Sequence, residues 1–191
     1  MQIVVLSGKG GTGKTTVAVS LAKTTGFTYV DCDVEEPNGF VFLSPQIEKV
    51  VDVTIPNPVI DRSKCITCGK CAAVCQFNAL AVTRKGIMLF EKMCHGCGAC
   101  LLTCPTGAIT EQLRAIGKID IGRNADIECI RGVLDVGEPM AGPVISAIKK
   151  LIADERDTIV DCAPGSSCNV VKAITGIGDF KRVLSICDFL V

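Results

Sequence analysis

Short apolar runs that end in glycine or acidic residues dominate the beginning of the chain. Residues 3–7 form a continuous apolar run before a group of glycines, which is the pattern of a buried parallel strand. Residues 14–25 place Val17 and Leu21 on one side at helical spacing, and residues 27–32 form a second apolar run. Together these segments predict a strand–loop–helix–strand unit with a right-handed crossover.

The later part of the chain continues to alternate between strand and helix patterns. Residues 50–60, which include Pro56 and Pro58, predict a strand and then a non-helical link. The remaining predicted elements are strands at 116–121 and 127–136, a helix at 143–153 with Pro143 near its first turn, a buried strand at 158–161 and an apolar helix at 179–191.

A cysteine-rich segment at about residues 61–110 interrupts this pattern and contains an internal repeat. Eight of the 13 cysteines form two runs of the pattern C-x2-C-x2-C-x3-C, and the second run follows the first by 29 positions. We therefore expect a first part of the main domain at 1–60, an insertion at 61–110 and a second part at 111–191. The two runs consist of Cys65, Cys68, Cys71 and Cys75, and of Cys94, Cys97, Cys100 and Cys104.

Composition narrows the class of protein. Hydrophobic residues make up 48% of the chain and charged residues 21%, which supports a folded core and argues against disorder. The formal net charge is +0 and aromatic residues are 4%, so we expect no nucleic-acid partner. The N-terminus lacks a basic leader, and no apolar run reaches the ~18 residues of a membrane span. We therefore expect a cytoplasmic protein without a membrane anchor, in which regular cysteines bind metal rather than form disulfides.

A complete phosphate-binding motif follows the first predicted strand. Its glycines let backbone N–H groups converge on phosphate oxygens, and the N-terminus of the next helix adds a positive end. Lys14 is expected to reach the terminal phosphates and Thr15 to ligate Mg²⁺. The alternative is a glycine-rich turn that binds nothing, but the strand before the motif and the helix after it favour the phosphate loop. The predicted nucleotide-binding residues are Gly8, Gly10, Gly11, Thr12, Gly13, Lys14, Thr15 and Thr16.

The loop at residues 8–16 resembles the deviant Walker A loop of the MinD/ParA group of P-loop ATPases. The resemblance rests on a second lysine, Lys9, which in that group reaches across a dimer to the partner's nucleotide. The neutral alternative is a solvated loop lysine. With Lys14, Lys9 would belong to the catalytic residues.

Two acidic segments resemble the switches of the same group. In the first, Asp31-Cys32-Asp33, the resemblance implies that Asp33 orients the attacking water and that Asp31 lies near Mg²⁺. In the second, which runs from Asp161 to Gly165, Asp161 would act on Mg²⁺ through water and Gly165 would lie near the γ-phosphate. The alternative for each is a strand end with turn residues. Both segments follow a buried strand, and ligands of open α/β sheets bind at that edge.

Membership of this group implies an α/β fold with a doubly wound, mostly parallel P-loop sheet. It also implies ATP and Mg²⁺ as ligands and a homodimer that forms on nucleotide binding. The group has further strands after the second switch, including one that recognises adenine, whereas residues 176–179 here lead into the predicted helix. We therefore expect the C-terminus to be abbreviated or incomplete, and the adenine-binding residues are not identified.

The cysteine repeat resembles a bacterial two-cluster ferredoxin, and implies a small α+β insertion with two [4Fe-4S] clusters. Gly69, Gly96 and Gly98 would leave backbone room beside the inorganic sulfurs. In such ferredoxins a proline often follows the fourth cysteine of a run. Pro105 follows this pattern in the second run, whereas Gln76 departs from it in the first. Two zinc ions are the competing interpretation. The resemblance assigns one cluster to Cys65, Cys68, Cys71 and Cys104, and the other to Cys94, Cys97, Cys100 and Cys75.

The cysteines outside the repeat are predicted to pack in the core as small apolar residues. A redox role for Cys32 and Cys162, which flank the predicted nucleotide site, is the alternative. His95 lies inside the second cysteine run, and we interpret it as a loop residue rather than a ligand. The cysteines in question are Cys32, Cys129, Cys162, Cys168 and Cys187.

The two resemblances together favour an iron–sulfur protein that hydrolyses ATP and couples nucleotide state to electron transfer. Hydrolysis is expected to be slow and to depend on a partner or on dimerisation, and a redox partner protein would exchange electrons with the clusters. Two alternatives remain open at this point. One is an ATPase that assembles or carries iron–sulfur clusters or other metalloclusters, and the other is a redox-sensing nucleotide switch.

Overall fold

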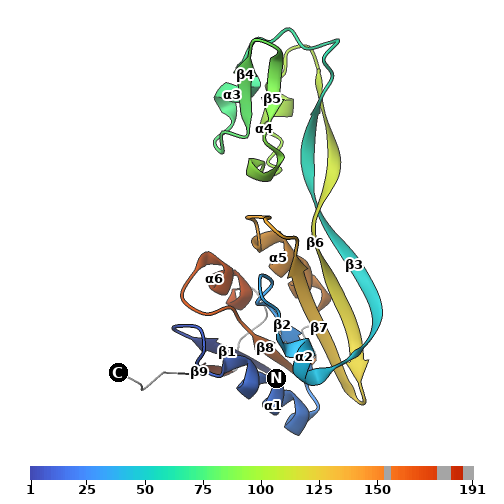
Figure 1. The fold of residues 1–191 in the computed structure, drawn as a ribbon, viewed down its shortest axis with the longest axis vertical. Coiled ribbons are helices and arrows are strands. Elements are labelled where there is room, and N and C mark those ends of the chain that lie inside the picture. Colours follow the sequence, from blue (N-terminus) through green and yellow to red (C-terminus); the bar gives the residue numbers. More distant parts are fainter. Residues whose placement is uncertain (153–155, 176–181, 187–191) are drawn as a thin grey trace. The chain divides into compact units, whose positions relative to one another are not determined.

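The computed structural model describes residues 1–152, 156–175 and 182–186 and divides the chain into two compact units (Figure 1). The first, called here the sheet unit, consists of Met1–Val53, Gly117–Val136 and Ala141–Val191. The second, called the cysteine unit, consists of Thr54–Ile116 together with Gly137–Met140. The predicted insertion at 61–110 falls within the cysteine unit, which extends beyond it at both ends.

A seven-stranded sheet forms the centre of the sheet unit, in the order β3-β6-β7-β2-β8-β1-β9 (Figure 1). The pairs β1–β8, β1–β9, β2–β7 and β2–β8 are parallel, and β6 runs antiparallel to β7. The molecule is therefore a mixed α/β protein with a mostly parallel sheet, as predicted. The strands are β1 (Gln2–Ser7), β2 (Thr28–Asp31), β3 (Gln46–Ile60), β6 (Ile109–Asn124), β7 (Ile127–Leu134), β8 (Thr158–Asp161) and β9 (Arg182–Ile186).

Helices pack against both faces of this sheet. Val5, Tyr29 and Ile159 share a core cluster with residues of α1 (Lys14–Thr25) and α2 (Gly39–Leu43). Neighbouring strand residues point to the opposite face. There Gly132 of β7 faces side chains of α5 (Gly142–Leu151), and α5 packs on α6 (Cys168–Ile174). This double coverage explains why all four residues of β8 are buried.

Two predictions about elements are wrong. The predicted helix at 179–191 is contradicted by β9, whose five residues pair in parallel with β1; the other positions of that range lie outside the described residues. A short apolar run fits a strand and a helix equally well, and here the edge of the sheet decides. The predicted link is also absent, because β3 continues through Pro56 and Pro58. It lies at the edge of the sheet order, where proline is tolerated.

The cysteine unit contains a two-stranded antiparallel sheet of β4 (Leu80–Thr83) and β5 (Gly86–Leu89). Two short helices, α3 (Lys70–Val74) and α4 (Ala99–Leu102), pack against each other, and a 3-10 turn η1 (Glu91–Met93) precedes the second cysteine run. Parts of β3 and β6 complete the unit. Its small core combines the cysteines with aliphatic side chains: Cys71, Leu80, Ile87, Cys100 and Ile109.

None of the helices in the described ranges is long and apolar enough to cross a membrane.

A buried ion pair joins the two segments of the cysteine unit. The Arg114 guanidinium on β6 donates to Glu138 through Nη1 at 2.6 Å and through Nη2 at 3.4 Å. Their side chains are 16% and 3% exposed, so water screens the pair weakly. Hydrogen bonding to Glu138 raises the pKa of Arg114 above its usual value, because this effect is larger than the lowering caused by burial. The loop Gly137–Met140 is thereby fixed within this unit.

Replacing Glu138 by alanine is expected to lower the free energy of unfolding by about 3 kcal/mol, because the Arg114 charge stays buried without its partner. Denaturant unfolding followed by circular dichroism measures the change. The control is Lys64→Ala in the exposed Lys64–Asp61 pair, which is expected to change stability by less than about 1 kcal/mol. Equal effects of the two substitutions would contradict the structural role of the buried pair.

Candidate functional sites

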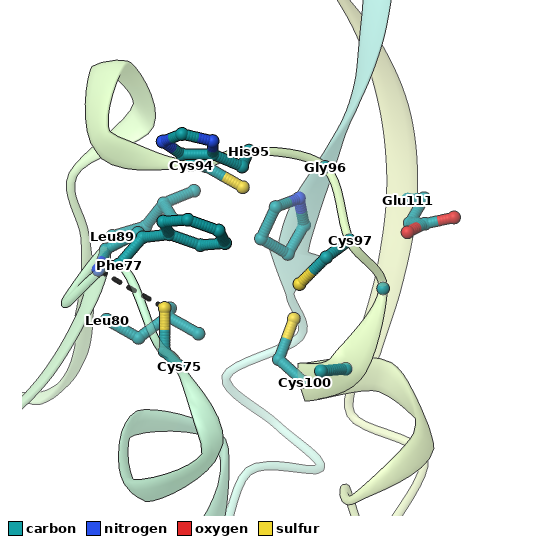
Figure 2. A pocket seen from close by; sticks show the side chains of 14 residues that line it. Cys75, Phe77, Leu80, Leu89, Cys94, His95, Gly96, Cys97, Cys100 and Glu111 are labelled. Atoms are coloured by element: carbon teal, nitrogen blue, oxygen red, sulfur yellow. Dashed lines mark hydrogen bonds between the residues drawn. The ribbon is translucent and has the colours of Figure 1, made fainter.

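The eight repeat cysteines gather around two pockets of the cysteine unit. One pocket is lined by Cys65, Cys68, Cys71 and Cys104, and the other by Cys75, Cys94, Cys97 and Cys100. Figure 2 shows the second pocket, where the four sulfur atoms face a common space. Each pocket thus takes three cysteines from one run and the fourth from the other run, which is the grouping that the ferredoxin resemblance implies. All eight are free thiols in the structure.

The two cysteine runs share one backbone conformation. Gly69 and Gly98 precede α3 and α4 in the left-handed conformation, with φ of 76° and 72°. Asn78 and Gly107, 29 positions apart, also have positive φ, as do Thr67 and Gly96. A Cβ atom at Gly96 would lie 2.8 Å from the Pro56 carbonyl oxygen, so only glycine fits there. The sequence repeat is therefore a structural repeat.

Backbone amides donate hydrogen bonds to the fourth cysteine of each run. The Ala79 N–H donates to Cys75 Sγ at 3.3 Å, and the Ala108 N–H donates to Cys104 Sγ at 3.2 Å. Burial acts to raise the pKa of Cys104, but donation from Thr106 and from backbone N–H groups outweighs it and lowers the pKa. Such donors favour the thiolate, which is the form that binds metal.

The third cysteine of each run lies in the core of the unit. Burial raises the pKa of both Cys71 and Cys100 above the usual value for a thiol. A buried thiolate needs a compensating positive charge, and a bound iron cluster would supply it. The four-thiol donor set, the apolar lining and the N–H···S bonds of each pocket fit a [4Fe-4S] cluster.

The surroundings of the two pockets differ. His95 and Phe77 stack beside the second pocket, with ring centroids 3.7 Å apart and an angle of 7° between the planes (Figure 2). The position equivalent to Phe77 in the other half of the repeat is Thr106, whose hydroxyl lies 3.7 Å from Cys104 Sγ. His95 thus lies outside the helices and strands and contacts an aromatic ring.

The predicted phosphate loop joins β1 to α1 in the sheet unit. Gly13 precedes α1 in the left-handed conformation, with φ of 84°, and Lys14 is only 7% exposed. A cleft with a volume of about 400 Å³ is lined by the loop and by one end of α2. The Thr12 hydroxyl is buried and has no hydrogen-bond partner among the described residues, as a group left for a phosphate would be. The lining residues are Gly11, Thr12, Gly13, Lys14, Thr15, Thr16, Asn38, Val41 and Phe42.

Some residues of the predicted nucleotide site do not line this cleft. Gly8, Lys9 and Gly10 are exposed positions at the beginning of the loop. Gly165 has a φ of 86°, and its N–H donates to the Ser7 carbonyl at the end of β1. The second predicted switch is therefore connected by a hydrogen bond to the strand that precedes the predicted phosphate loop.

The aspartates of the two predicted switches are neighbours in the sheet. Asp31 at the end of β2 pairs in register with Asp161 at the end of β8. Burial, followed by the charge of Asp161, raises the pKa of Asp31 to about 7. Burial also raises the pKa of Asp161, although the nearby Thr15 hydroxyl and the charge of Lys14 act to lower it. The pKa of Asp33 is raised by burial as well, and the Lys14 charge opposes this shift. Carboxylates and a nearby ammonium form a donor set suited to Mg²⁺ and phosphate.

A tyrosine that sequence reasoning missed lies between these aspartates. The Tyr29 hydroxyl is 3.0 Å from Asp161 Oδ2 and 3.3 Å from Asp31 Oδ2. The only signal for it in the sequence is a polar-tipped aromatic residue in an otherwise apolar strand two positions before Asp31.

The cysteines outside the repeat are predicted to pack in the core, and this prediction is confirmed for three of them. Cys32, Cys129 and Cys162 are buried. Cys168 is exposed, so the core prediction is wrong at this position, since it begins α6 at the surface. Cys187 lies outside the described residues.

Comparison with known proteins gives a match for part of the chain. Residues 58–111 match a family model described as "4Fe-4S dicluster domain". The matched residues include all eight cysteines of the repeat. An uncharacterized ferredoxin of Methanocaldococcus jannaschii is 36% identical over 70 residues, which cover 35% of this chain and 91% of that protein.

Two further relatives match longer stretches of the chain. An uncharacterized protein of M. jannaschii is 34% identical over 183 residues, which cover 93% of this chain and 64% of that protein. A component of the F(420)H(2) dehydrogenase of Methanosarcina mazei is 28% identical over 143 residues, which cover 65% of this chain and 38% of that component. The chain thus spans less than two thirds of the length of either relative.

Proposed function

We propose that this chain transfers electrons under the control of ATP. Residues 58–111 match a 4Fe-4S dicluster domain, whose clusters supply one-electron chemistry when they are bound. One relative is a component of a redox enzyme, F(420)H(2) dehydrogenase, which supports an electron-transfer role with a redox partner protein. The observation that carries the proposal is the insertion of the cysteine unit between the two acidic segments of the sheet unit.

The residues of the cysteine unit would hold the clusters against a partly apolar lining. Each pocket provides four thiols, and aliphatic side chains such as Leu80 and Ile109 line the pockets. The N–H groups of Ala79 and Ala108 would donate to ligand sulfurs and stabilise their negative charge. Hydrogen bonds of this kind and solvent exposure set cluster potentials.

The residues of the sheet unit would bind ATP and Mg²⁺. Backbone N–H groups of the phosphate loop and the Thr12 hydroxyl would contact phosphate oxygens, and Lys14 would neutralise the terminal phosphates. Thr15, Asp31 and Asp161 would hold Mg²⁺ and its waters, and Asp33 would orient the attacking water. The exposed Lys9 would act on the nucleotide of a second copy in a homodimer. Slow hydrolysis would reset the nucleotide state.

The two long strands β3 and β6 provide a route by which the nucleotide state could be coupled to the clusters. β3 and β6 each begin in one unit and end in the other, and they are neighbours in the sheet (Figure 1). β6 is hydrogen-bonded to β7, and β7 pairs with β2, which is the strand that carries Asp31. Movement of the first acidic segment on nucleotide binding would be transmitted through these ladders.

Electron transfer from the reduced protein tests the proposal. Protein purified without oxygen is reduced with dithionite, freed of reductant and mixed with a one-electron acceptor such as a viologen dye or an acceptor ferredoxin. We expect Mg-ATP to change the transfer rate at least about tenfold, which corresponds to a 1.4 kcal/mol change in the barrier. The same mixture with Mg-ADP is the control. Equal rates with ATP, with ADP and without nucleotide would overturn the coupling.

A further inference from the structure

We propose that Tyr29 is a positioning residue for the magnesium site, through its hydroxyl contact with Asp161 and Asp31. The inference rests on the proposed binding of Mg-ATP and assigns a role to a residue outside the motifs. Tyr29 is fully buried in β2, and its side chain packs with residues of α1 and α2 on one face of the sheet.

The hydroxyl has one hydrogen and two carboxylates within reach. It lies 3.0 Å from Asp161 Oδ2 and 3.3 Å from Asp31 Oδ2, and a single hydroxyl donates to one acceptor at a time. Asp31 already accepts backbone hydrogen bonds, from Asp33 N–H at Oδ1 and from Gly39 N–H at Oδ2, each at 3.1 Å. Asp161 has no such backbone donors within the described structure, and its neighbouring donors are the hydroxyls of Tyr29 and Thr15. The shorter contact of the Tyr29 hydroxyl is the one to Asp161, so we assign the donated hydrogen bond to this carboxylate.

The second oxygen of Asp161 carries the inference further. Asp161 Oδ1 is buried and has no hydrogen-bond partner among the described residues. A buried carboxylate oxygen without a partner is costly unless a ligand completes it. Tyr29 contacts Oδ2, so Oδ1 would remain available to help hold Mg²⁺ when the ion is bound.

The neighbouring backbone is adapted to the hydroxyl. A Cβ atom at position 39 would lie 1.9 Å from the Tyr29 oxygen, so residue 39 must be glycine where Tyr29 occupies this position. Gly39 begins α2, and its N–H is one of the donors to Asp31. Tyr29 therefore contacts the start of α2 and the aspartates of both acidic segments, and its hydroxyl fixes their relative orientation.

Binding of a fluorescent ATP analogue to the intact cluster-loaded protein tests this role in the variant Tyr29→Phe. Affinity is measured in EDTA and over a range of Mg²⁺ concentrations. Mg²⁺ is expected to increase the affinity for the analogue, and the Mg²⁺ concentration that gives half of this increase should be about ten times higher in the variant. Removal of a residue that hydrogen-bonds to a metal ligand has an effect of this size. Affinity in EDTA should stay within about twofold of the wild type, because the phosphate loop is unchanged.

Val30→Ala, in the same strand, is the matched control. Val30 is also fully buried, and its side chain lies on the opposite face of β2. If the substitution only loosened the strand, Tyr29→Phe and Val30→Ala would show the same Mg²⁺ requirement, and that result would overturn the positioning role. An unchanged Mg²⁺ requirement in Tyr29→Phe would also overturn it. Wild-type protein that binds no nucleotide would overturn the proposed function itself. Unchanged cluster absorbance and circular dichroism identify folded variants.

Discussion

A Cys104→Ala/Cys71→Ala double variant is expected to retain about four irons per chain, whereas Cys104→Ala/Cys100→Ala is expected to retain almost none. The first pair belongs to one pocket, so only one [4Fe-4S] cluster loses ligands. The second pair draws one cysteine from each pocket, so both clusters lose a ligand. The wild type should hold about eight irons, because each cluster contains four.

This comparison separates crossed from uncrossed ligation. If each cysteine run held its own metal, the Cys104/Cys100 pair would damage one centre and the Cys104/Cys71 pair would damage both. Iron and acid-labile sulfide analysis of protein purified without oxygen measures the outcome, and electron paramagnetic resonance of the reduced protein counts the remaining spins. Cys168→Ala, at an exposed cysteine outside both pockets, serves as the control and should leave the iron content unchanged. Zinc in place of iron would contradict the cluster assignment.

Lys14→Ala is expected to lower ATP hydrolysis by about a hundredfold or more, the usual effect of removing one preorganised charge or donor at a reacting phosphoryl or acyl centre. Lys14 is almost fully buried beside the cleft, so no solvent-exposed lysine replaces it. The same variant should lose the effect of ATP on electron transfer while it keeps its iron, because the cysteine pockets lie in the other unit.

Phosphate release and iron content, measured on the same preparation, check both halves of this expectation. The exposed Lys150 on α5 provides the matched control, since Lys150→Ala removes an equal charge away from the cleft. Retention of ATP hydrolysis in Lys14→Ala would show that the glycine-rich loop is an ordinary turn. Loss of iron together with hydrolysis would indicate unfolding rather than a lost contact.

The cysteine pockets could be predicted from the sequence because three of four ligands in each come from one short loop. A spacing of two or three residues leaves few backbone paths, and the positive φ angles at Gly69 and Gly98 repeat the same path in each half. The predicted phosphate loop is local in the same sense, since Gly8 to Thr16 are consecutive. Motifs of this kind carry their geometry within a few residues.

Features that depend on distant neighbours were not predictable. Residues 182–186 form a strand because β1 offers an open edge, which no pattern within the segment reveals. β3 tolerates its prolines because it lies at the end of the sheet order. Tyr29 becomes informative only when the pairing of β2 with β8 brings Asp31 beside Asp161 and when Gly39 leaves room for the hydroxyl. Each of these depends on register between separate segments.

The Arg114–Glu138 pair bears on how such an insertion spreads between proteins. Thr54–Ile116 contains every repeat cysteine, yet the counter-charge of Arg114 comes from Gly137–Met140, which the chain reaches only after β7. A graft of the first segment alone into a foreign host would separate Arg114 from the carboxylate with which it pairs in this chain. A transplant of Thr54–Ile116 is therefore expected to be more stable when it includes the distant loop or replaces Arg114.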